Sequence, residues 1–186
     1  MGRWWSEQLL LLARLDGDEQ SPGDDGADAS AAASQAVHEA EAAQGRAGRV
    51  RIVGAERSVP VDVPEPLLVS AIRNLLDNAL RFAPPDTFVV LKIERIDEDR
   101  IRFTVLDRGP GLSEIECEQA TERFWRRAKT PDGSGLGLAI VAAIAERHGG
   151  DLRLAPRVDG GLSAELTLPA RCERRADEPA RKGPSS

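Results

Sequence analysis

The sequence predicts an α/β fold in which one mixed sheet carries helices over one face. Two long apolar segments, at residues 67–83 and 135–147, have the spacing of buried helices. Short apolar runs that suit strands lie before, between and after them, at 50–53, 59–63, 88–95, 101–106, 152–154 and 162–168. Strands that flank and interleave with long helices are typical of a sheet packed against a helical layer.

The ends of both helices are marked in the sequence. Pro64 and Pro66 predict the start of the first helix, because proline is tolerated in a first turn. Pro84–Pro85 stops this helix near Ala83. The second helix is expected to close at His148–Gly150, where glycine suits a C-terminal cap. The two strands before the first helix are expected on either side of a turn.

The segments outside this unit differ in character. Residues 4–15 have the spacing of a short amphipathic helix, and residues 16–28 are rich in Gly, Asp and Pro, which indicates a flexible linker. Residues 30–44 are alanine-rich, so we expect a helix whose polarity leaves little to bury. Beyond Ala170 the chain is charged and poor in apolar residues, and we expect disorder.

The composition limits the classes of function. With 186 residues the chain has room for one ordinary domain plus tails. A formal net charge of -6 argues against nucleic acid as a partner, since nucleic acid calls for a basic face. Cys117 and Cys172 are too few for a disulfide framework or a zinc site. No segment approaches the roughly 18 apolar residues that a membrane-spanning helix needs.

Short motifs with chemical meaning follow one another between residues 74 and 138. They read N-L-L-D-N-A at 74–79, D-R-G-P-G at 107–111, R-F-W-R at 123–126 and G-S-G-L-G-L at 133–138. Each motif alone also has a structural explanation, because helices and turns use the same residues. Together and in this order they predict a nucleotide site.

The first motif places polar side chains on an apolar helix. Asn74, Asn78 and Arg81 are spaced by four and three residues and therefore share one helix face. An asparagine carbonyl is a suitable oxygen ligand for Mg²⁺, which usually keeps several waters and phosphate oxygens as well. The structural alternative is a helix whose polar face simply meets water.

The second motif begins with an acidic residue at the end of a strand. The Asp107 carboxylate can accept a hydrogen bond from an exocyclic amine, and Gly109 and Gly111 let the backbone approach a flat ring. The alternative is a strand-ending turn that uses Asp and Gly for its own geometry.

The last two motifs suit a lid and a phosphate cradle. Residues 133–137 lie at the N-terminus of an apolar helix, where free N–H groups and the helix dipole favour an anion. A flexible, glycine-rich helix entry is the alternative. Phe124 and Trp125 are interpreted as the packing anchor of a mobile lid. The cations available for phosphate are Arg81, Arg126, Arg127 and Lys129.

Taken together, these motifs resemble the N box, the two glycine boxes and the F box of the catalytic, ATP-binding domain of sensor histidine kinases. The resemblance covers about residues 50–169. It implies the Bergerat ATP-binding fold, an α/β two-layer sandwich with a mixed sheet and helices packed on one face. It also implies ATP and Mg²⁺ as cofactors, and a kinase that transfers the γ-phosphoryl group of ATP to a histidine.

The resemblance assigns roles by motif position. It makes Asn78 the Mg²⁺ ligand, Asn74 a support for the triphosphate and Arg81 a basic residue that faces the phosphates. Phe82 would pack on adenine, and Asp107 would hold its amino group. The other positions would shape the base pocket, hinge the lid or close it on the phosphates: Gly109, Gly111, Phe124, Gly133, Gly135, Leu136, Gly137 and Leu138.

One position separates this chain from other enzymes of the resembled fold. Its hydrolases and serine kinases typically carry a glutamate one helical turn before the Mg²⁺ asparagine, as the base for water or a hydroxyl. Here that position is Asn74, which cannot take a proton at neutral pH. A neutral imidazole needs no deprotonation before it attacks phosphorus. The motif therefore favours a histidine acceptor over an ATPase.

The resemblance also predicts the organisation and partners of the chain. No segment reads like the family's H box (His-Glu-Leu-Arg-Thr-Pro), so we expect the acceptor histidine elsewhere. Residues 1–16 resemble the end of the dimerisation hairpin. After them we expect a linker and polar helix (17–48), the catalytic domain (49–170) and a disordered tail (171–186). The implied partners are a histidine-bearing dimerisation domain or an intact kinase, and a response regulator downstream.

We expect the chain to be monomeric, because too little of the dimerisation hairpin is present for a stable dimer. We also expect it to be cytoplasmic, although full-length members of the resembled family are often anchored in the inner membrane. The alternative function is a non-catalytic nucleotide-binding regulatory fragment, which would bind ATP without transferring phosphate.

Overall fold

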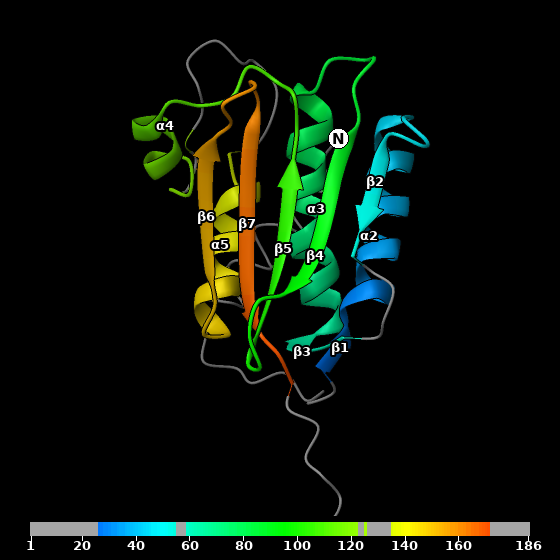
Figure 1. Cartoon of the computed structure of the whole chain (residues 1–186), viewed down its shortest axis with the longest axis vertical. Coiled ribbons are helices and arrows are strands. Elements are labelled where there is room, and N and C mark those ends of the chain that lie inside the picture. The colour runs from blue at the N-terminus through cyan, green and yellow to red at the C-terminus, as the bar shows by residue number, and fades with distance from the viewer. Residues whose placement is uncertain (1–25, 55–58, 123–124, 126–134, 172–186) are drawn as a thin grey trace, which may run out of the picture.

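The computed structural model describes residues 26–54, 59–122, 125 and 135–171, in which the strands form two sheets. The strands are β1 Gly26–Asp28, β2 Val50–Val53, β3 Pro60–Pro64, β4 Val89–Arg95, β5 Arg100–Leu106, β6 Asp151–Pro156 and β7 Leu162–Pro169. The main sheet has five strands in the order β2-β4-β5-β7-β6 (Figure 1). The second sheet pairs β1 with β3.

The longer helices form a layer on one face of the main sheet. The helices are α2 Ala29–Gln44, α3 Glu65–Phe82, α4 Glu114–Gln119 and α5 Gly137–Arg147. Figure 1 shows α2, α3 and α5 behind the strands, whereas α4 lies beside the end of β6. The predicted fold class, an α/β two-layer sandwich with a mixed sheet, is therefore confirmed.

The main sheet is mixed because of one strand. β2 runs parallel to β4, and the other neighbouring pairs of this sheet are antiparallel. Both strands expected around the turn after residue 53 are present, but β3 pairs with β1 and belongs to the other sheet. Parallel strands need a long crossover, and α3 lies in the connection between β2 and β4.

The core lies between the main sheet and the helical layer. Every second residue of a strand points to the same face, so β4, β5 and β7 each present an apolar row to the helices. The largest fully buried side chains come from these rows, from α3, and from α5 and its N-cap residue: Leu68, Ile72, Leu75, Leu76, Leu80, Leu91, Ile101, Phe103, Leu136, Ile140, Ile144 and Leu166.

α3 begins and ends where the sequence predicts. Pro64 precedes its first residue and Pro66 lies in its first turn, where a missing N–H breaks no helical hydrogen bond. The last helical bond runs from Ala83 N to Ala79 O at 2.9 Å. The backbone then becomes extended at Ala83, as expected for a residue before proline. The first motif therefore lies along the C-terminal half of α3.

α2 buries more than its polar sequence indicates. Its buried residues form one stripe, at helical spacing, on a helix that packs against α3: Ala29, Ala32, Ala33, Ala36 and Ala40. The expectation that this helix leaves little to bury is wrong. Alanine adds little hydrophobicity, but its small side chain lets two helices approach closely and exclude water.

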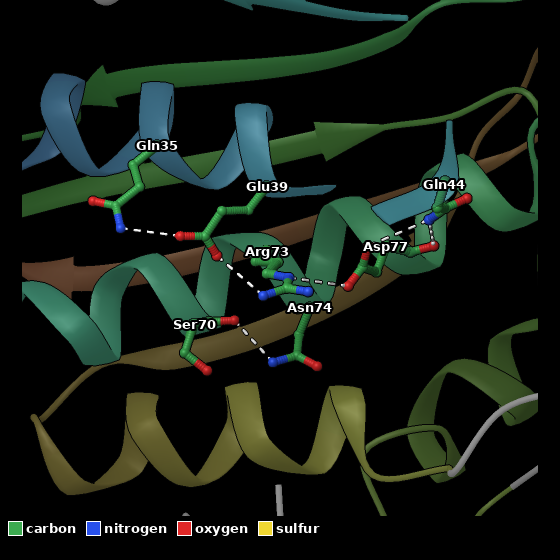
Figure 2. A network of polar contacts seen from close by, with 7 residues as sticks. All are labelled: Gln35, Glu39, Gln44, Ser70, Arg73, Asn74 and Asp77. Carbon is green, nitrogen blue, oxygen red and sulfur yellow. Dashed lines mark hydrogen bonds and ion pairs between the residues drawn. The ribbon is translucent and has the colours of Figure 1, made fainter. Parts of the chain in front are cut away.

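A polar network joins α2 to α3 (Figure 2). Arg73 contacts Glu39 of α2 at 3.0 Å and Asp77 of its own helix at 3.6 Å. Gln44 donates through Nε2 to the main-chain carbonyl of Asp77 at 3.0 Å and to its Oδ1 at 3.3 Å. Asn74 points away from this network toward α5. The network therefore holds one side of α3 while the other side carries Asn74.

We expect Ala36→Leu to lower the free energy of unfolding by about 1–3 kcal/mol, because added methylenes overpack a fully buried helix contact. Urea denaturation followed by circular dichroism measures the change. Ala42→Leu is the matched control, since Ala42 is exposed on the same helix and should change stability by less than about 0.5 kcal/mol. Equal effects of the two substitutions would contradict the packing of α2 on α3.

Some predictions concern residues that the structure does not describe. The expected helix at 4–15 and all of the expected tail (171–186) except Arg171 lie outside the described residues; Arg171 N donates to Pro60 O at 2.9 Å. The division of the chain into hairpin remnant, linker, catalytic domain and tail stays a prediction. Within the described part of the chain, no helix has the length and apolar character needed to cross a membrane.

Candidate nucleotide site

Asp107 follows the last residue of β5 and has a buried carboxylate. Only 5% of the residue is exposed. Its Oδ1 accepts hydrogen bonds from Gly109 N at 2.6 Å and from Leu162 N at 3.3 Å, whereas no described residue donates to Oδ2. Burial raises the pKa of Asp107, opposed by these two N–H donors and by the charge of Arg157. The backbone thus holds one oxygen and leaves the other for a ligand.

The end of α3 packs against the loop after β5. A Cβ at Gly109 would lie 2.9 Å from the main-chain oxygen of Phe82 and 3.0 Å from Oδ1 of Asp107, so only glycine fits between them. The Phe82 residue is 38% exposed at this junction. The structure therefore brings together the aromatic residue and the acid that were predicted to bind adenine.

Asn74 links α3 to the start of α5. It is 6% exposed and donates through Nδ2 to the main-chain oxygen of Ser70 at 2.8 Å (Figure 2). Its Oδ1 would lie only 3.1 Å from a Cβ at Gly137. At this position the polar stripe does not simply meet water, because the amide is buried where two helices approach.

Asn78 and Arg81 continue the same helix face. Asn78 is half-buried, and no described residue hydrogen-bonds to its side chain. Nη2 of Arg81 is buried without a hydrogen-bond partner in the described part of the chain. The Arg81 guanidinium carbon lies 5.4 Å from the centroid of the Phe82 ring. A buried guanidinium N–H without an acceptor is costly, and an anionic ligand would satisfy it.

α5 begins at Gly137, two residues later than expected. Gly135 has a φ of 68°, and Leu136 is the N-cap residue without a side-chain capping hydrogen bond. The Leu136 side chain lies in the core and Leu138 packs against it, so both residues anchor the helix start. The first N–H groups of a helix lack intrahelical acceptors, which suits this end of α5 to an anion.

The predicted lid is not placed by the structure. Phe124 and Gly133 lie outside the described residues, as do the cations Arg126, Arg127 and Lys129. Their roles as lid hinge, lid and phosphate contacts stay predictions. The described part of the site comprises the C-terminal half of α3, the loop after β5 and the start of α5.

The turn between β6 and β7 also contacts the candidate site, although in the sequence it is only a polar, glycine-containing segment between two expected strands. A Cβ at Gly161 would lie 2.1 Å from the main-chain oxygen of Asp107, and one at Gly111 would lie 2.7 Å from that of Gly161. Asp107 N donates to Leu162 O at 3.1 Å. These contacts join segments distant in sequence, so local patterns could not reveal them.

Two arginines that follow α2 contact the end of α3 and the segment after it. Arg46 donates to the main-chain oxygen of Leu80, near the end of α3. Arg49 donates to the main-chain oxygens of Thr87 at 2.8 Å and Pro84 at 2.6 Å. The last carbonyls of a helix lack intrahelical donors, and Arg46 supplies one to Leu80, whereas Arg49 binds the segment that follows α3. A run of basic residues after a predicted helix is the only sequence signal for this role.

We expect Gly161→Ala to lower the free energy of unfolding by at least about 2 kcal/mol and to weaken nucleotide binding. Gly161 has a φ of 99°, and its added Cβ would displace the Asp107 backbone. Gly160→Ala is the matched control, because Gly160 has a φ of 82° with nothing within 4 Å of its Cβ. Urea denaturation and ATP titration compare the two variants. If both variants lose the same stability and affinity, contact between this turn and Asp107 is unimportant.

Comparison with known proteins assigns the family. The family described as "Histidine kinase-, DNA gyrase B-, and HSP90-like ATPase" matches residues 64–171, which include the described site. The chain belongs to this family, and the described domain is a histidine kinase ATP-binding domain. The resemblance stated from the motifs is thereby confirmed.

The similar proteins are sensor kinases. The chain is 34% identical to the sensor-like histidine kinase SenX3 of Mycolicibacterium smegmatis over 174 residues, covering 87% of this chain and 43% of that protein. It is 43% identical to the signal transduction histidine-protein kinase/phosphatase MprB of Mycobacterium sp. strain KMS over 110 residues, 56% of this chain and 21% of that protein. The chain thus spans less than half the length of these relatives.

Solved structures of histidine kinases have a similar fold. The mycobacterial sensor histidine kinase MprB superposes with a TM-score of 0.67 at 28% identity, covering 78% of this chain and 97% of that one. Full-length ShkA in complex with AMPPNP gives a TM-score of 0.71 at 26% identity, covering 88% of this chain and 35% of that one.

Proposed function

We propose that this domain binds Mg²⁺-ATP and donates the γ-phosphoryl group to a histidine that lies outside residues 1–186. The observation that carries the proposal is Asn74, buried beside Gly137 at the start of α5. An amide at this position can hold a phosphate but cannot take a proton. A site without a base there suits an acceptor that is already nucleophilic at neutral pH.

The described residues fit an adenine base. Oδ2 of Asp107 can accept the exocyclic amine, since the backbone already holds Oδ1 in place. Phe82, whose main-chain oxygen lies with this carboxylate beside Gly109, is 38% exposed, and its ring would offer the base an apolar face. The ShkA relative is solved in complex with AMPPNP, which supports an adenine nucleotide as the ligand.

The same helix face fits the phosphates and their metal. Nη2 of Arg81 lacks an acceptor among the described residues, and the start of α5 offers main-chain N–H groups. No described group of three or more His, Cys, Asp or Glu side chains could hold a metal ion alone. Mg²⁺ needs only one or two protein oxygens when phosphates and waters complete its shell, and Oδ1 of Asn78 would supply one.

In the proposed reaction the protein positions the reactants. When bound, Mg²⁺ neutralises charge on the phosphates. The lone pair of the neutral imidazole forms the nitrogen–phosphorus bond while the bond from the γ-phosphorus to the bridging oxygen breaks, and ADP leaves. Arg81 balances the phosphate charge, and Asn74 holds the triphosphate against the start of α5. The absence of a carboxylate at position 74 disfavours water as a competing nucleophile.

We infer that a histidine-bearing dimerisation domain or an intact kinase supplies the acceptor, and that a response regulator receives the phosphate afterwards. The relatives SenX3 and MprB, which are sensor and signal transduction histidine kinases, support this inference. The net charge of -6 gives no support for nucleic acid as a partner. We propose a cytoplasmic location, where ATP is available, and a monomeric state in isolation.

Labelled phosphate transfer tests the proposed function. The chain is mixed with the histidine-bearing hairpin of a related kinase, Mg²⁺ and ATP labelled at the γ-phosphate. We expect acid-labile label on the hairpin, and no label on a matched hairpin with its histidine replaced by glutamine. ATP binding without transfer to any suitable hairpin would instead favour the non-catalytic regulatory fragment. Multiple turnover of ATP without an acceptor would favour an ATPase.

A further inference from the structure

Arg157 is 50 residues from Asp107 in sequence and contacts it in the structure. It lies after β6, at the start of the turn to β7. Its Nη1 donates to the main-chain oxygen of Asp107, and its charge lowers the pKa of the Asp107 carboxyl against the opposing effect of burial. No motif identified from the sequence includes this arginine.

The β6–β7 turn, which carries Arg157, contacts Asp107 through residues at both ends of the turn. Within the turn, Arg157 N donates to Gly161 O and Gly160 N donates to Arg157 O, each at 3.1 Å. At its far end, Leu162 donates to the Asp107 carboxylate at 3.3 Å and accepts from Asp107 N at 3.1 Å. Arg157 therefore holds the main-chain oxygen of Asp107, while Leu162 holds both its main-chain N–H and its carboxylate.

This arrangement bears on which nucleobase the site prefers. A carboxylate that is ionised and fixed in direction accepts an exocyclic N–H more strongly than a protonated or misdirected carboxyl group does. We propose that Arg157 is a positioning residue for Asp107, and that the β6–β7 turn thereby sets the preference for a base that carries an exocyclic amine. The inference rests on the proposed nucleotide function and names the determinant of its base specificity.

Binding of Mg²⁺-ATP and Mg²⁺-inosine triphosphate to the full chain, measured by calorimetry, tests the inference. Inosine carries a carbonyl oxygen where adenosine carries the amine. We expect Arg157→Ala to weaken ATP binding about five- to tenfold, with little change for inosine triphosphate, so that the preference for ATP falls. Arg157→Lys should restore part of the preference, since it keeps the charge and a donor.

The matched control is Arg153→Ala on β6. The Arg153 side chain is 80% exposed and pairs with Asp151 on its own strand, so this substitution should leave the ATP preference unchanged. If the wild-type chain prefers ATP and Arg157→Ala keeps the same preference, the inference about Arg157 is wrong. If the wild-type chain does not bind ATP, or binds both nucleotides equally, the proposed adenine site itself is wrong.

Discussion

Asp107→Asn is expected to weaken ATP binding by about 10- to 100-fold while the domain keeps its fold. Asparagine preserves Oδ1, which accepts from Gly109 N and Leu162 N. It replaces Oδ2 with an NH₂ group, which would face the donor amine of adenine with a second donor. A hydrogen bond to a charged group is lost and two donors are opposed, so both effects reduce affinity. Calorimetric titration with Mg²⁺-ATP measures the change.

Asp77→Asn is the matched control for this substitution. Asp77 also has a pKa raised by burial, but it accepts from Gln44 at the contact between α2 and α3. It lies on the side of α3 away from Asn74 (Figure 2). Its replacement should leave ATP affinity unchanged. Should Asp107→Asn unfold the domain, or bind ATP like the wild-type chain, the carboxylate would be a structural turn residue and nothing more.

The same carboxylate predicts how ATP binding depends on pH. Because burial raises the pKa of free Asp107 above 3.8, ATP affinity should begin to fall on acidification at a higher pH than for an ordinary aspartate. The contribution of Asp107 to stability has the opposite sign. The folded chain takes up this proton before the unfolded chain does, so stability from this group rises as pH falls through the folded pKa. Affinity titrations over pH check this, and the asparagine variant should lack the response.

Asn78→Ala is expected to reduce phosphoryl transfer by on the order of 100-fold, because the proposed Mg²⁺ ligand is lost. Alanine favours the helix, and the described residues form no hydrogen bond to the Asn78 side chain, so α3 should remain folded. Initial rates of phosphohistidine formation at several Mg²⁺ concentrations measure the loss. ATP binding in the presence of a chelator should change little, because the substitution removes only the metal contact.

Gln35→Ala is the matched control. It removes a side-chain amide from the exposed side of α2 and so tests whether the loss of any amide lowers the rate. It should leave both the transfer rate and its Mg²⁺ dependence unchanged. A rate for Asn78→Ala close to that of the wild-type chain would rule out Asn78 as the essential metal ligand.

The helices that carry the site were predictable, whereas the partners of several strands and helices were not. For α3, the spacing of apolar residues and the flanking prolines predict an end within one residue of the observed end and a start within two residues of the observed start. The partner of β3 depends on β1, a three-residue strand in a segment that reads as linker. α4 was missed although Ser113 and Glu116 form a capping box, because its six residues bury only Cys117. Short elements carry too little local signal.

The motifs indicated the candidate site residues, whose roles stay predictions, but they did not indicate what surrounds these residues. Asn74 and Asp107 each had a structural alternative. For Asp107 the structure shows the turn contact with Gly109, which also orients the carboxylate, and its role in binding stays a prediction. The contribution of Arg157 depends on a contact between residues 50 positions apart. No periodicity encodes such a contact, because it follows from the pairing of β5 with β7.

Amide chemical shifts of the ¹⁵N-labelled chain, recorded while AMPPNP and Mg²⁺ are added, test the central claim most directly. An ATP site between α3, the loop after β5 and the start of α5 predicts the largest changes at Gly109, Gly137 and the side chain of Asn78. The uncovered sheet face, marked by the contact of Arg102 with Glu165, should stay unchanged. An absence of changes at those three positions, or changes confined to that outer face, would contradict an ATP site at this place in the fold.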